Sequence, residues 1–102
     1  MPPLEQINIS AVAFKEGDAW VVQGIEYDIV AHAYEIAKLP HAFTRAVLEN
    51  IVITKHLGRK PLQGIKEAPA RFRDMYERAE TELRPTHPDP TPAPQVVVRL
   101  AA

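Results

Sequence analysis

The chain has 102 residues, a net charge of −1 and no cysteine. This length corresponds to one domain, and a hydrophobic fraction of 46% with 25% charged residues is typical of a soluble globular protein. Without cysteine the chain has no disulfides, thiolate metal ligands or cysteine nucleophiles. No basic region followed by an apolar run opens the sequence, and no stretch reaches the roughly 18 apolar residues of a membrane span, so we expect a cytoplasmic protein.

Three short segments in the first third of the chain predict β-strands. Residues 7–14, 19–25 and 29–34 combine period-two alternation of apolar residues with a composition rich in strand-forming side chains. Gly17 lies in the first connection, where it can take the positive φ of a tight hairpin. We therefore expect a three-stranded antiparallel meander.

The hydrophobic rhythm changes near residue 38, where a helical stripe begins. The stripe consists of Leu39, Ala42, Phe43, Ala46, Val47, Asn50, Ile51, Thr54 and Leu57. Pro40 suits the first turn of a helix, but neither Lys38 nor Leu39 is a good capping side chain, so the start should be irregular. Gly58 suits the position just beyond the helix end.

We expect this helix, over residues 39–57, to lie across one face of the meander and to give an α+β fold. Its inward side chains Phe43, Val47 and Ile51 should then be buried. Residues 59–66 read as a loop, and the apolar spacing that follows predicts a second helix over residues 69–83.

We place a single α+β domain at residues 1–84, followed by a linker at residues 85–94 and a terminal strand or tail at residues 95–102. Residues 85–94 hold five prolines and predict an extended linker, because neither a helix nor a sheet interior accepts that density of proline. The β-branched run that follows predicts a terminal strand within residues 95–102.

A lone strand has no stability in water, so we expect this terminal segment to add as an edge strand, either to its own sheet or to the sheet of a second copy. The exchange between two copies is the preferred alternative, since two-fold dimers are the commonest oligomers. The candidate contacts of the partner or oligomer are Val96, Val97, Val98 and Leu100.

The charges are segregated along the chain. Residues 36–73 hold eight basic and two acidic side chains, whereas residues 1–35 hold one basic and six acidic ones. We expect a basic helix and loop to lie over an acidic sheet edge and partly neutralise it, and a nucleic-acid footprint is the alternative.

No motif for catalysis, metal binding or nucleotide binding is found in the sequence. The residues that come nearest to a polar site are His32 and Tyr34 in the third strand and Glu26 and Asp28 just before it. We expect no cofactor, no bound metal and no catalytic histidine, because no histidine has a partner at a spacing typical of such sites.

The order of elements resembles the N-terminal domain of HicB-type antitoxins. The segments that carry this resemblance are residues 18–22, residues 29–33 and Leu39-Pro40-His41-Ala42-Phe43 at the start of the helix. The resemblance covers residues 7–57 and implies a β-β-β-α unit in which Ala42 packs the helix onto the sheet, with a toxin as protein partner. Residues 96–100 are similar to the opening strand of a ribbon-helix-helix, but no helices follow it in this sequence.

Together these observations predict a non-enzymatic interaction module that acts through a protein partner or its own oligomer. The alternative is a small nucleic-acid-binding protein or a hydrolase that uses the basic segment 55–73 and His32.

Overall fold

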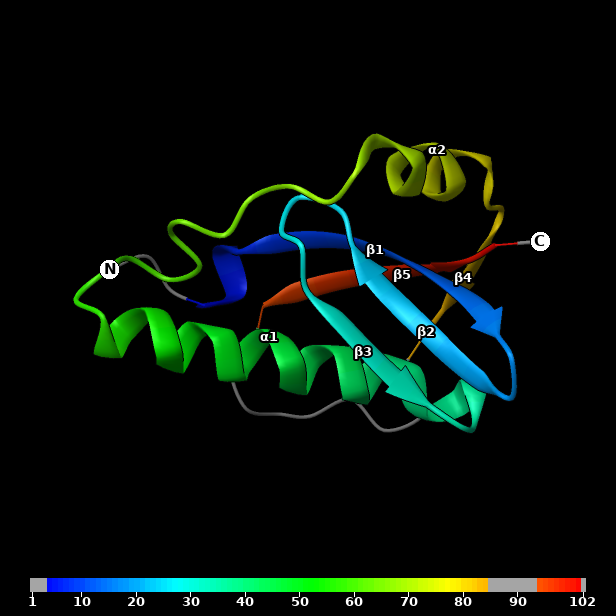
Figure 1. Cartoon of the computed structure of the whole chain (residues 1–102), viewed down its shortest axis with the longest axis horizontal. Coiled ribbons are helices and arrows are strands. Elements are labelled where there is room, and N and C mark those ends of the chain that lie inside the picture. Colours follow the sequence, from blue (N-terminus) through cyan, green and yellow to red (C-terminus); the bar gives the residue numbers. More distant parts are fainter. Residues whose placement is uncertain (1–3, 85–93, 102) are drawn as a thin grey trace.

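The computed structural model describes residues 4–84 and 94–101, which form one mixed α+β unit (Figure 1). Its elements in chain order are η1 (Leu4–Gln6), β1 (Asn8–Glu16), β2 (Ala19–Gly24), β3 (Val30–Ala33), η2 (Ile36–Lys38), α1 (Leu39–His56), α2 (Ala70–Arg78), β4 (Thr81–Leu83) and β5 (Gln95–Leu100). The five strands make one sheet, with α1 on one face and α2 on the other.

The predicted antiparallel meander is confirmed. β1 pairs with β2 and β2 with β3, both antiparallel, and the register aligns Ala13, Val22 and Ala31 in one row across the sheet. Gly17 has a φ of 62° in the first turn, as the sequence indicated.

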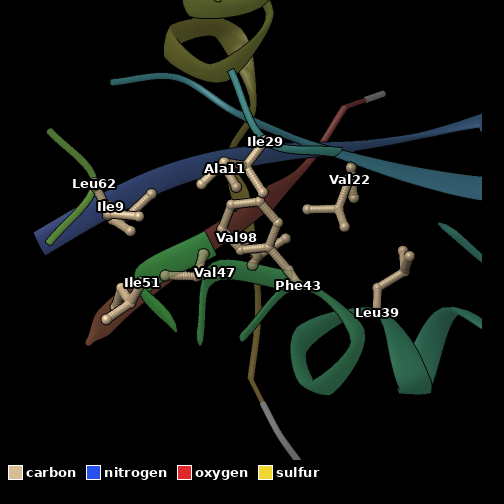
Figure 2. Packing of buried hydrophobic residues seen from close by; sticks show 11 residues of the cluster. Ile9, Ala11, Val22, Ile29, Leu39, Phe43, Val47, Ile51, Leu62 and Val98 are labelled. Carbon is tan, nitrogen blue, oxygen red and sulfur yellow. The ribbon is translucent and has the colours of Figure 1, made fainter. Parts of the chain in front are cut away.

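The predicted burial of α1 is also confirmed. Phe43 and Val47 are fully buried and Ile51 is only 7% exposed, and Figure 2 shows them pointing toward the side chains of the sheet. The sheet residues in this cluster include Ile9 and Val22. Ala42, which the resemblance places against the sheet, is half-buried.

The two ends of α1 compare differently with the sequence predictions. Lys38 makes no side-chain capping bond and the turn η2 leads into the helix, so the predicted irregular start is confirmed. Leu57 was expected on the buried stripe, and this is wrong, since Leu57 is 61% exposed. The Leu57 N–H still donates to the Ile53 carbonyl, as in a helix, but Leu57 lies beyond Thr54, the last buried residue of α1.

The terminal strand β5 pairs with β1 of its own chain, one of the two arrangements that the sequence left open. The pairing is parallel, and the strand order is β3-β2-β1-β5-β4. β5 is therefore not an edge strand as predicted, because β4 pairs with its other side. Val98 at its centre is 1% exposed and belongs to the same core as Ile9 and Phe43.

The second helix is shorter than predicted. α2 ends at Arg78, Ala79 is extended with φ −76° and ψ 134°, and residues 81–83 form β4. A helix that continued to Leu83 would leave the backbone groups on the outer side of β5 without partners, whereas β4 supplies them. Residues 85–93, most of the predicted proline-rich linker, lie outside the described part of the chain.

The sheet face opposite α1 is covered by α2 and by the loop that leads to it. The rings of Phe14 and Phe72 stack with their centroids 5.9 Å apart. The Arg99 guanidinium lies 4.3 Å from the centroid of the Tyr76 ring and donates a hydrogen bond to the Tyr76 carbonyl at 3.3 Å. In residues 4–84 and 94–101, no helix is both long and apolar enough to cross a membrane.

Candidate interaction surface

Glu26 and Asp28, two of the four predicted polar-site residues, stabilise the turn between β2 and β3. The Ser10 backbone N–H donates to Glu26 Oε1 at 2.7 Å, and Gln23 Nε2 donates to Asp28 Oδ1 at 2.9 Å. The Ile25 carbonyl lies opposite Ser10 but accepts a hydrogen bond from the Ala68 N–H. The Glu26 carboxylate therefore replaces this carbonyl as the acceptor for the Ser10 N–H. Both carboxylates therefore have structural partners.

His32 and Tyr34 lie elsewhere, toward the other end of β3. His32 lies opposite Val21 of β2, whereas Asp28 precedes β3 and bonds to the side chain of Gln23. His32 is exposed on β3, and Tyr34 is 83% exposed just beyond it. The structure thus does not bring the four predicted residues together. Among the described residues, no group of three His, Asp or Glu side chains is placed to hold a metal ion.

The open edge of β3 is the feature that the structure adds. The Gly24 N–H donates to the Ile29 carbonyl at 2.8 Å. Bonded and non-bonded residue pairs alternate along an antiparallel ladder, so Ala31 and Ala33 also bond to β2. Val30 and His32 consequently direct their backbone N–H and C=O groups away from β2, and β3 is the last strand on its side of the sheet.

The two edges of the sheet differ in charge. β3 (Val30–Ala33) contains no charged side chain, and both Val30 and the following Tyr34 are exposed. At the opposite edge, β4 carries Glu82, which pairs with Arg84 at 3.5 Å, and Glu80 precedes the strand. Charges on an edge strand discourage the addition of a further strand. The β4 edge therefore has this protection, whereas the β3 edge does not.

The terminal residues predicted as partner contacts serve the sheet itself. Val96, Val98 and Leu100 pack in the core cluster on the α1 side, while Val97 faces the other side and is 36% exposed. Their strand partner is β1.

The basic segment 55–73 follows the end of α1, the loop and the start of α2. Its basic side chains are all exposed, and they are Lys55, His56, Arg59, Lys60, Lys66, Arg71 and Arg73. The loop joins the acidic turn through its backbone, because the Asp28 N–H donates to the Lys66 carbonyl at 2.7 Å. This bond places the Lys66 backbone beside the turn that holds Glu26 and Asp28.

In comparisons with protein-family models, curated proteins and solved structures, the chain has no match. The candidate surface is therefore defined by geometry alone. Sequence reasoning missed it because the open edge depends on which strands pair. The sequence signal that could have indicated this edge is the contrast between residues 30–33, which contain no Asp, Glu, Lys or Arg, and residues 80–84, which contain three such side chains.

Proposed function

We propose that this protein is a non-enzymatic interaction module that accepts a strand of another polypeptide along the open edge of β3. The observation that carries the proposal is the outward direction of the backbone groups of Val30 and His32 on a strand without charges. Strand addition at such an edge gains main-chain hydrogen bonds and reads the alternate side chains of the added strand.

The placement of the polar residues supports a non-enzymatic role. A general acid–base pair needs two groups within hydrogen-bonding reach of one substrate. Glu26 and Asp28 are engaged in the turn, whereas His32 lies within β3 opposite Val21 and is exposed. The hydrolase alternative thus has no assembled set of residues in its favour.

An antitoxin-like role is the more specific form of this proposal. The order β1-β2-β3-α1 and the packing of α1 on the meander agree with the unit implied by the HicB resemblance. In that form, the added strand belongs to a toxin.

Nucleic-acid binding is the second candidate, favoured by the exposure of all basic side chains in segment 55–73. Binding of this kind weakens steeply as salt rises, because phosphate contacts release counterions. This candidate is tested by titration with a labelled single-stranded and a labelled duplex oligonucleotide at about 50 and about 200 mM salt. Affinities that depend on phosphate contacts fall by about a thousandfold or more over this range.

The proposed strand addition is tested by affinity purification of the tagged full chain from extracts of cells that carry its gene. His32→Pro removes the outward N–H of β3, while Glu82→Pro is its matched control at the opposite edge, where alternation also turns Glu82 outward. Circular dichroism should show that both variants fold. We expect the proteins held by the wild type to be retained by Glu82→Pro and lost by His32→Pro; equal retention by His32→Pro would refute the proposal.

A further inference from the structure

We infer that the strand added to β3 is β3 of a second copy, in an antiparallel pair whose two-fold axis passes beside His32. This inference rests on the proposed function and names the partner of the same edge. The resulting dimer would have one continuous ten-stranded sheet, because each copy contributes the five strands of the order β3-β2-β1-β5-β4.

The distribution of charge favours this pairing over the other ways of joining two sheets. β3 opposite β3 places no carboxylate, lysine or arginine side chain against its symmetry mate, since residues 30–33 contain none. β4 opposite β4 would bring Glu82 near its symmetry mate. β3 opposite β4 would join the copies head to tail, which leaves a free edge at each end and leads to open chains rather than a closed dimer.

The exposed apolar side chains select the register. Val30 is 42% exposed and Tyr34 is 83% exposed, and they flank His32 at a distance of two residues on either side. If His32 lies opposite its symmetry mate, Val30 of each copy faces Tyr34 of the other, which directly follows β3 at a bend in the chain. An aromatic side chain opposite a β-branched one is a favourable cross-strand pair. An axis at Ala31 would instead place Val30 opposite His32 and leave Tyr34 without a partner.

The size of the contact sets its strength. β3 has four residues, so the strand pair is short and the buried area falls at the low end of specific interfaces. We therefore expect a reversible dimer whose population depends on concentration.

The experiment is sedimentation equilibrium of the purified full chain over a range of concentrations. The mass should rise from 11.4 kDa toward twice that value. His32→Glu and His32→Lys each place like charges across the axis, so each variant alone should remain monomeric, and an equimolar mixture of the two should recover the dimer. Glu82→Lys changes charge at the opposite edge and should leave the wild-type behaviour unchanged.

The inference is wrong if the wild type stays monomeric up to about 1 mM. A dissociation constant of that size corresponds to a binding free energy of only about 4 kcal/mol. The inference is equally wrong if the single His32 variants dimerise as the wild type does. A monomeric wild type whose captured proteins are still lost in His32→Pro would refute the second copy alone and leave strand addition intact. A monomeric wild type whose captured proteins are retained by His32→Pro would refute both the second copy as partner and strand addition at β3.

Discussion

The Thr54 hydroxyl joins α1 to the loop that follows it, because Thr54 Oγ1 accepts a hydrogen bond from the Leu62 backbone N–H at 3.1 Å. The same hydroxyl donates to the Ile51 carbonyl at 2.9 Å, and both Thr54 and Leu62 are buried. Leu62 has a φ of 65°, an unfavourable conformation for a branched side chain, and the hydroxyl helps to hold it there.

We expect Thr54→Val to lower the free energy of unfolding by about 1–3 kcal/mol, because it leaves the buried Leu62 N–H without a partner. Thr54→Ser keeps the hydroxyl and loses one methyl group, so it should cost no more than about 1 kcal/mol. Urea unfolding of the two variants makes the comparison. Equal stabilities would contradict the anchoring role of the hydroxyl.

Gly24 lies where the β2–β3 turn approaches α1. A Cβ atom at this position would lie 2.5 Å from the Tyr27 carbonyl oxygen and 3.1 Å from Phe43 Cζ. We expect Gly24→Ala to cost about 1–3 kcal/mol, since backbone and core must both shift. Gly17→Ala meets no atom within 4 Å and carries only the strain of its φ of 62°, about 1 kcal/mol, so it serves as the comparison in thermal unfolding.

Phe43 is the largest side chain in the fully buried set. Truncation to alanine should reduce stability by about 3–5 kcal/mol through the lost transfer energy and the cavity left behind. Val52 on the same helix is 53% exposed, and Val52→Ala should stay within about 0.5 kcal/mol of the wild type. Denaturant midpoints that are alike for the two variants would show that α1 does not pack as described.

Val98 and Val97 are neighbours in β5 with opposite surroundings. Val98 is 1% exposed in the core, so Val98→Ala should cost about 1.5–3 kcal/mol, whereas Val97→Ala should cost clearly less.

Removal of residues 95–102 should abolish cooperative unfolding, because β1 and β4 both lose their partner. A truncated chain that melts cooperatively near the wild-type temperature would argue that β5 is dispensable.

The meander and α1 were predictable because their signals are local. The alternation in β1, the positive φ at Gly17 and the helical stripe through Phe43 all act within one element or one turn. The structure places Ile9 of β1 in the core cluster with α1 and stacks Phe14 on Phe72 of α2.

The remaining features depend on partners that are distant in the sequence. Leu83 fits the helical spacing of the preceding stripe as well as it fits a strand, and only pairing with β5 decides between them. The parallel pairing of β1 with β5 joins segments at opposite ends of the described chain. The open β3 edge follows from that strand order, so the candidate surface was beyond local patterns.

The position of β5 between β1 and β4 also has a consequence for biosynthesis. During translation, β1 emerges first and must wait for residues 95–100 before its second ladder forms. Until then the side of β1 that bonds to β5 has no partner strand, and the core lacks Val98. A chain that stops before residue 95 would therefore keep an unpaired strand edge on β1, which would make it prone to aggregation.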